Sequence, residues 1–309
     1  MWYLKNIRLV NFMGYRDVSF SFLDANNKPK KVYLIFAPNG CGKTSLLNAI
    51  NLVYNSPRLK GRPLLGKYVY NEDYDPVYHG TAVKEAVAFS NKVKIEATLW
   101  NTDTNSEGTV ILNNNGTVET CLEEAGGGYY IDADNPMHSN KFQIAGDYAK
   151  QFLDLAEIIY NFPCSFRENN KEVKALSKAL WRHDKQMSAA LDLDFHNDFI
   201  INKYGVKVHY KTFSGGEKKI ATMLSQICDP NYITNASAVI IDSFEKEIYF
   251  KRQSRTVDKL VEDFSDKQFF IVTHSETLIK HVKQKYGEEC LYDIEQYKLK
   301  DLGITSYNN

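Results

Sequence analysis

Alternating apolar and polar residues predict half-buried strands at the start of the chain. Residues 3–12 alternate in this way, and residues 18–22 alternate again after a turn that we predict at residues 13–16. One side of each strand would therefore face a core and the other side solvent. We predict that the protein begins with a small antiparallel β layer.

A β-meander is predicted further along the chain. Residues 92–100 alternate, and residues 109–112 and 117–120 continue the pattern through Asn-Gly turns. The apolar face of the first of these strands carries Val93, Ile95, Ala97 and Leu99. Three consecutive glycines at 126–128 predict a flexible joint after the meander, and residues 200–210 predict a short hairpin.

Continuous apolar runs, which are typical of strands buried on both faces, occur three times. They cover residues 32–36, 236–242 and 269–275. Apolar residues at helical spacing follow these runs, at 45–53, at 252–264 and from residue 276. Strands that alternate with helices predict a parallel sheet whose functional residues lie at the carboxyl ends of its strands.

Residues 37–44 read Ala-Pro-Asn-Gly-Cys-Gly-Lys-Thr and join the first buried strand to its helix. Strand, glycine-rich turn and helix are the context of a phosphate-binding loop, in which backbone N–H groups and the positive end of the helix dipole surround an anion. Lys43 would reach the β- and γ-phosphates, and the Thr44 hydroxyl would ligate Mg²⁺. Ala37 replaces the usual first glycine, which requires a negative φ there. The predicted nucleotide contacts in this segment are Asn39, Gly40, Cys41, Gly42, Lys43, Thr44 and Ser45.

Composition narrows the class of protein but does not identify a partner. The 309 residues are 43% hydrophobic and 25% charged with a formal net charge of zero, so any contact with DNA has to come from a local patch. The five cysteines are scattered, which argues against a zinc site or disulfide framework and favours a reducing cytoplasm. The apolar runs are too short to cross a bilayer, and the first residues form no secretion signal. Cys41 lies where a helix N-terminus could lower its pKa, although a small residue that simply fits the loop is the plainer interpretation.

Further motifs follow the phosphate loop in a fixed order. They are Phe142-Gln143, then Phe213-Ser214-Gly215-Gly216-Glu217, then the strand ending at Asp242, and finally Val272-Thr273-His274-Ser275. In this order they resemble the ABC-type ATPase head, and within that family the SMC-like, RecF-like and OLD-type ATPases. The sequences Ile7-Arg8-Leu9-Val10-Asn11-Phe12 and Pro38-Asn39-Gly40 resemble that branch specifically.

The resemblance implies a role for each motif. In such heads the signature, here Ser214, Gly215, Gly216 and Glu217, contacts the γ-phosphate held by a second subunit, so that ATP is enclosed between two heads. Asp242 would hold Mg²⁺ through water, Gln143 would complete the coordination, and His274 would sense the γ-phosphate. The alternatives are an aspartate that caps a turn and a histidine that is an ordinary polar residue.

The sequence departs from the family directly after Asp242. Most members place a catalytic glutamate there, but this chain has Ser243, which is a far weaker base. OLD-type heads carry a second acid at the spacing of Glu245, so Glu245 is the candidate base or water-orienting residue, with Glu247 as a weaker alternative. Hydrolysis is therefore expected to be slow or to need a partner, with Lys43, Glu245 and His274 as the catalytic candidates.

We predict an α/β P-loop NTPase of the ABC-head type with a mixed β-sheet core, an N-terminal antiparallel β layer and a helical/β insertion that carries the signature. A single head over residues 1–309 would comprise a nucleotide-binding lobe with the β-meander (1–145), a helical signature lobe (146–235) and a final part with the acidic strand and the histidine (236–309).

The predicted function is that of a cytoplasmic ATPase that binds ATP and Mg²⁺, pairs with itself around the nucleotide and acts in DNA repair, recombination or defence against foreign DNA. DNA and an effector protein are the possible further partners, and no membrane partner is expected. The main alternative is an ATP-dependent scaffold that holds an effector and hydrolyses poorly. The sequence lacks the loop that is usual in transporter subunits, which argues against a transporter. A simple P-loop kinase would leave Ser214 and His274 without a role.

Overall fold

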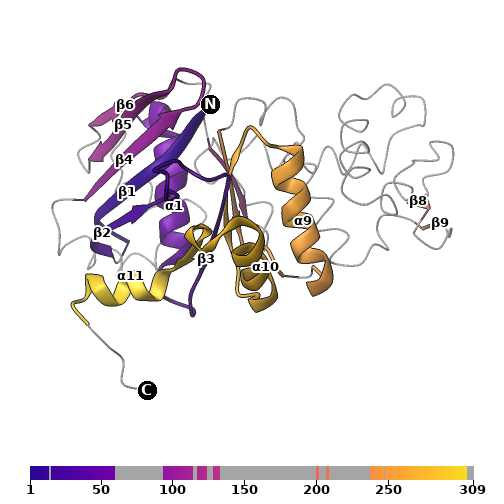
Figure 1. Cartoon of the computed structure of the whole chain (residues 1–309). Helices are drawn as coiled ribbons and strands as arrows, with labels where there is room; N and C mark the ends of the chain where they lie inside the picture. Colours follow the sequence, from indigo (N-terminus) through magenta and orange to yellow (C-terminus); the bar gives the residue numbers. More distant parts are fainter. Residues whose placement is uncertain are drawn as a thin grey trace.

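The computed structural model describes residues 1–13, 15–59, 93–113, 117–123, 128–132, 200–201, 207–208, 237–246 and 248–304. Within them, two five-stranded sheets enclose one helix (Figure 1). The predicted helices in the signature lobe, Gln143, and the signature residues 214–217 lie outside the described residues. None of the described helices is both long enough and apolar enough to span a membrane.

The first sheet is antiparallel and confirms the predicted N-terminal layer and the meander. In spatial order its strands are β2 (Tyr15–Ser21), β1 (Trp2–Phe12), β4 (Lys94–Asn101), β5 (Ser106–Asn113) and β6 (Val118–Thr120). The side chains of Val93, Ile95, Ala97 and Leu99 are all buried, as the alternation predicts. The predicted turn at 13–16 is too long, because Tyr15 and Arg16 already belong to β2.

The second sheet is parallel and contains the three predicted buried strands. In spatial order its strands are β12 (Leu291–Asp293), β3 (Val32–Phe36), β11 (Gln268–Val272), β10 (Ala238–Asp242) and β7 (Gly128–Asp132). The prediction of a glycine joint at 126–128 is wrong at its last residue, since Gly128 begins β7 and pairs with Ala238. A separate two-stranded pairing of β8 (Ile200–Ile201) with β9 (Lys207–Val208) confirms the predicted hairpin.

Helices cover the parallel sheet on both faces. Helix α1 (Lys43–Tyr54) contacts both sheets, and α9 (Phe250–Asp263) and α10 (Glu276–Tyr286) pack together on the other side of the parallel sheet (Figure 1). Short 3₁₀ turns follow at Ser56–Leu59 and Glu288–Cys290. The last helix, α11 (Ile294–Asp301), contacts β2.

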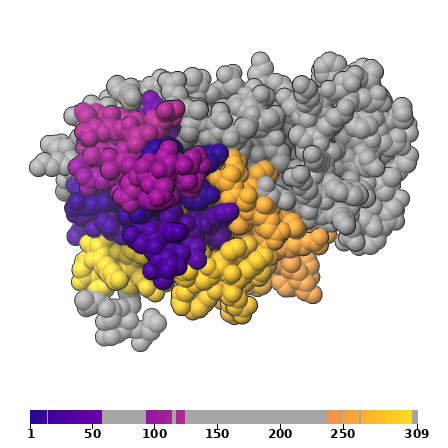
Figure 2. Space-filling view, turned by 45° about the horizontal axis from the view of Figure 1, so that its top comes forward, coloured from indigo at the N-terminus to yellow at the C-terminus, as the bar shows by residue number. Residues whose placement is uncertain are grey.

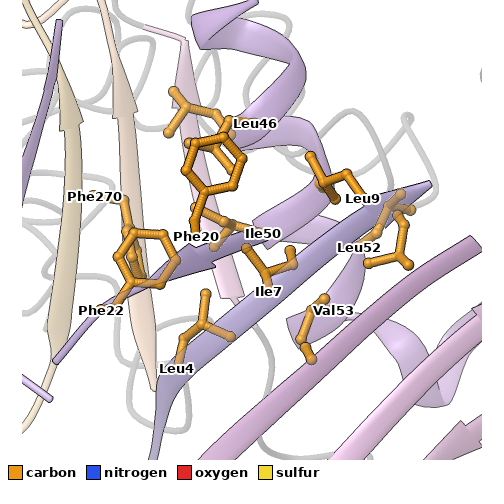
Figure 3. Close-up of a cluster of buried hydrophobic side chains, with 14 of the residues drawn as sticks. Leu4, Ile7, Leu9, Phe20, Phe22, Leu46, Ile50, Leu52, Val53 and Phe270 are labelled. Carbon is orange, nitrogen blue, oxygen red and sulfur yellow. The ribbon is translucent and has the colours of Figure 1, made fainter. Parts of the chain in front are cut away.

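The core lies between α1 and the two sheets. Leu4, Ile7 and Leu9 of β1 point toward Leu46, Ile50 and Val53 of α1 (Figure 3). Phe22 and Phe270 continue the cluster to the parallel sheet, with ring centroids 5.2 Å apart. Burial of these apolar side chains holds the phosphate loop, which precedes α1, in a fixed place.

A buried polar junction also joins the two sheets. The side-chain amide of Gln268 on β11 donates to the carbonyls of Leu4 (3.1 Å) and Lys30 (3.1 Å), and its oxygen accepts from the Leu4 N–H (2.7 Å). The Tyr54 hydroxyl lies 2.9 Å from the same amide oxygen and accepts a second bond from the Leu4 N–H. Gln268 is thus a partner of the Leu4 N–H, the Leu4 and Lys30 carbonyls and the Tyr54 hydroxyl at this junction.

We expect Gln268→Ala to lower the free energy of unfolding by about 2–3 kcal/mol, because buried backbone groups lose their partners. Urea denaturation of the purified protein measures this change. Gln296→Ala removes an exposed amide on α11 and should change the free energy by less than about 0.5 kcal/mol. Equal effects of the two substitutions would contradict a structural role for the Gln268 junction.

Candidate nucleotide site

The phosphate loop leaves the carboxyl end of β3 and enters α1 with the backbone that the sequence predicts. Gly40 and Gly42 adopt left-handed φ values of 82° and 97°, which glycine adopts without strain. Ala37 is not among the positive-φ residues of the described chain, so an alanine is tolerated there. Helix α1 begins without a side-chain cap and without an acidic residue in its first turn. Its first N–H groups and the positive end of its dipole are thus left to an anion.

Lys43 lies across this loop. Its ammonium group donates to the carbonyl oxygens of Ala37 (2.8 Å) and Pro38 (2.9 Å), and only 8% of the residue is exposed. Burial lowers the pKa of Lys43, because desolvation disfavours the charged form, while Cys41, Asp242 and Glu245 act in the opposite direction. An anionic ligand would therefore compensate a charge that the fold has already placed in a poorly solvated position.

Thr44 and Asp242 meet although they are far apart in the sequence. The Thr44 hydroxyl donates to the Asp242 carboxylate at 2.9 Å, and Asp242 stands at the carboxyl end of β10, two strands from β3 in the parallel sheet. A hydroxyl and a carboxylate are oxygen ligands that suit Mg²⁺. No group of three or more His, Cys, Asp or Glu side chains in the described ranges could hold a metal alone. The pair therefore fits an ion that takes its remaining ligands from phosphate and water, as Mg²⁺ commonly does.

The chain turns directly after Asp242. Ser243 adopts a left-handed φ of 54°, and the next N–H, of Phe244, donates to the Val272 carbonyl at the end of β11 (3.1 Å). This turn buries the Phe244 side chain and brings the Glu245 carboxylate to the backbone N–H of His274, at 3.0 Å. Glu245 thus lies at the same edge of the sheet as Asp242.

The Glu245 carboxylate uses only one of its oxygens for that contact. The other oxygen, Oε2, is buried and has no hydrogen-bond partner in the described part of the chain. His274 itself is exposed, and its backbone N–H, not its imidazole, makes the contact. The structure therefore offers a carboxylate oxygen with acceptor capacity beside the phosphate loop, while the sensing role of the His274 imidazole stays a prediction.

Among the predicted site residues that the structure describes, the catalytic and metal candidates gather at the carboxyl edge of the parallel sheet. They are Lys43, Thr44, Asp242, Glu245 and His274. Cys41 belongs to the loop, but desolvation by burial raises its pKa, whereas the start of a helix would lower it. Burial of the thiol thus opposes the effect of the helix start on the pKa of Cys41.

Sequence reasoning missed Tyr15, which contacts the loop directly. The Tyr15 hydroxyl donates to the Gly42 carbonyl at 2.9 Å from the first residue of β2. Nothing in the local sequence marks this residue, because the contact joins two segments 27 residues apart. The pairing of β1 with β2 sets the position of Tyr15, and packing in the core brings it to the loop.

Comparison with known proteins places this geometry in context. A family model described as the RecF/RecN/SMC N terminal domain matches residues 3–290. The phosphate import ATP-binding protein PstB of Bifidobacterium longum (strain NCC 2705) is 32% identical over 77 residues, which are 24% of this chain and 28% of that protein. The match thus spans little more than a quarter of the relative's length.

Solved structures of SMC heads also align with the chain. The SMC head domain from Thermotoga maritima has a TM-score of 0.48 and 13% identity, with 90% of this chain and 91% of that chain covered. An Smc head domain with an extended coiled coil, bound to the C-terminal domain of ScpA and derived from Pyrococcus furiosus, has a TM-score of 0.43 and 13% identity, with 91% and 92% covered.

Proposed function

Because the chain belongs to the RecF/RecN/SMC N terminal domain family, we propose that it is an ABC-type ATPase head that binds ATP with Mg²⁺, pairs with a second copy around the nucleotide and hydrolyses it. The observation that carries the proposal is the contact of Thr44 with Asp242 beside Lys43. It unites the three groups that a magnesium-nucleotide site needs, from two segments 198 residues apart in the sequence.

Each residue of the site has a distinct task in this proposal. Lys43 and the first N–H groups of α1 would hold the phosphates, and Thr44 and Asp242 would hold Mg²⁺, which would supply positive charge to neutralise the phosphates. Glu245 would orient the attacking water and accept its proton. The His274 backbone keeps the carboxylate in that position.

Pairing of two heads follows from the signature at residues 214–217, whose role rests on the family resemblance. Work on DNA in repair, recombination or defence, and OLD-type character, are proposals that rest on the same analogy. The competing proposal is a scaffold that binds ATP but hydrolyses it poorly, and the serine at position 243 favours it. A transporter role would assign to the whole chain the function of a relative that matches only about a quarter of it.

Sizing of the protein with and without ATP–Mg²⁺ tests the pairing. We expect ATP–Mg²⁺ to shift the wild type to a species of twice the mass or more, and we expect Ser214→Arg to stay unshifted, because a bulky cation would obstruct the contact with the second subunit's nucleotide. Ser19→Arg adds the same charge on the exposed outer face of the antiparallel sheet and should shift like the wild type. A wild type that binds ATP but keeps its size would overturn ATP-dependent pairing.

A further inference from the structure

The hydroxyl of Tyr15 occupies the space next to Gly42, at the junction of the phosphate loop and α1. A Cβ atom added to Gly42 would lie 2.8 Å from the Tyr15 hydroxyl oxygen and 3.0 Å from the ring carbon that carries it. Gly42 thus allows both the left-handed backbone and the approach of this side chain. The contact is direct and involves the last residue before α1.

The hydrogen bond from Tyr15 fixes the orientation of one peptide group. The Gly42 carbonyl accepts from Tyr15 at 2.9 Å and from the Leu46 N–H of α1 at 3.0 Å. Because a peptide group is planar, fixing that carbonyl also fixes the direction of the Lys43 N–H on the opposite side of the same peptide. This N–H is one of the unpaired donors at the start of α1, which a phosphate would accept.

Helix α11 in turn holds the start of β2. The two oxygens of the Asp301 carboxylate accept from the backbone N–H groups of Arg16 and Asp17, each at 2.9 Å, and the Asp301 side chain is 1% exposed. The Lys298 ammonium lies 5.1 Å from the centroid of the Tyr15 ring. In Figure 2 the C-terminal residues, in yellow, lie against the indigo N-terminal residues.

We infer that Tyr15 is a positioning residue for the phosphate loop, and that α11 sets its position through the contact of Asp301 with the start of β2. The inference rests on the proposed binding of ATP at this loop. A chain of contacts then runs from the C-terminal helix through Asp301, Tyr15 and Gly42 to the Lys43 N–H. A displacement of α11 would reach the phosphates without any contact between α11 and the nucleotide.

Packing in the core alone explains why the Tyr15 ring is buried. It does not explain why the Tyr15 hydroxyl donates to the Gly42 carbonyl. The Gly42 carbonyl already has the Leu46 N–H as its partner, so the Tyr15 bond is not needed to satisfy it. Burial raises the pKa of the Tyr15 hydroxyl, which therefore stays protonated and remains a donor. A purely structural hydroxyl and a positioning hydroxyl differ in one measurable respect, the affinity for the nucleotide.

Tyr15→Phe keeps the ring and removes only the donor. We expect its dissociation constant for ATP–Mg²⁺, measured by titration calorimetry, to rise by about three- to tenfold, since the free loop loses part of its preorganisation. Tyr33→Phe is the matched control, because the buried Tyr33 hydroxyl donates to the Phe22 carbonyl at 2.6 Å outside the phosphate loop. Both variants should lower the thermal unfolding temperature, but only Tyr15→Phe should weaken ATP binding.

A double-mutant cycle tests the part played by α11. Asp301→Ala should weaken ATP binding in the wild type and should have little further effect in Tyr15→Phe, because both act on the same peptide. Asp301→Asn keeps one acceptor oxygen and should fall between the wild type and Asp301→Ala.

Three results would count against the inference, and each is distinct. Unchanged ATP affinity in Tyr15→Phe would overturn the positioning role of Tyr15. An equal effect of Asp301→Ala in both backgrounds would overturn the coupling through Tyr15. A wild type that does not bind ATP–Mg²⁺ would remove the proposed function itself, and this inference with it.

Discussion

Lys43→Met is expected to weaken binding of ATP–Mg²⁺ by about 100-fold or more and to abolish turnover. The ammonium group of Lys43 lies across the phosphate loop, on the carbonyls of Ala37 and Pro38. A charge-assisted hydrogen bond contributes about 1.5–3 kcal/mol, and two such bonds to phosphate oxygens give an effect of this size. Methionine keeps most of the side-chain volume, so the fold should survive the change. Titration calorimetry and a phosphate-release assay measure the two effects.

A second buried lysine provides the control for Lys43. Lys267 is 3% exposed and pairs with Asp266, but it precedes β11 and therefore lies at the opposite edge of the parallel sheet from the phosphate loop. Lys267→Met should leave the affinity for ATP unchanged. If both methionine variants bound ATP like the wild type, Lys43 would not be a nucleotide ligand.

Glu245→Gln is expected to reduce the turnover number by about 100-fold or more while ATP binding stays intact. A positioned general base contributes about 10²–10⁴ to the rate, and a carboxamide cannot take up the proton. Glutamine has nearly the same shape and keeps an oxygen that can accept from the His274 N–H, so the loop after Asp242 should keep its conformation. If two heads enclose ATP, the paired species of this variant should also persist for longer.

Glu247→Gln separates the two candidate acids. We expect this variant to turn over ATP like the wild type, since Glu247 is the weaker candidate by its spacing from Asp242. A wild type and a Glu245→Gln variant that bind ATP and are equally inert would favour the scaffold proposal. Loss of turnover in Glu247→Gln alone would move the catalytic role to that residue.

The periodicity of apolar residues predicted the elements whose stability depends on local burial. The inward face of β4 and the continuous runs of β3, β10 and β11 are as expected, because each is buried by neighbours that the pattern itself implies. The predicted alternation of β1 is broken near its start, where Tyr3, Leu4 and Lys5 are all buried and the register with β4 shifts. Strand β7 was missed because its glycine start is unfavourable as an isolated strand, and its pairing with β10 and its contact with α1 stabilise it.

For the site, sequence reasoning located the groups whose spacing is fixed by chemistry. Gly40, Gly42, Lys43 and Thr44 lie within one loop, and Asp242 ends a strand that a parallel sheet brings to the same edge. Tyr15 was out of reach, since its role depends on the register of β1 with β2 and on α11, neither of which the local sequence specifies. The pKa of Cys41 was also out of reach, because it depends on how far the folded loop excludes water.

The junction between the two sheets consists of an amide, a hydroxyl and backbone groups, with no formal charge. Burial raises the pKa of the Tyr54 hydroxyl well above its usual value, and the Gln268 amide does not titrate. Changes of pH or ionic strength should therefore have little effect on this junction. Surface ion pairs such as Arg8 with Asp17 are weakened by acid and by high ionic strength. The two layers should therefore stay joined under conditions that strip such outer pairs from the molecule.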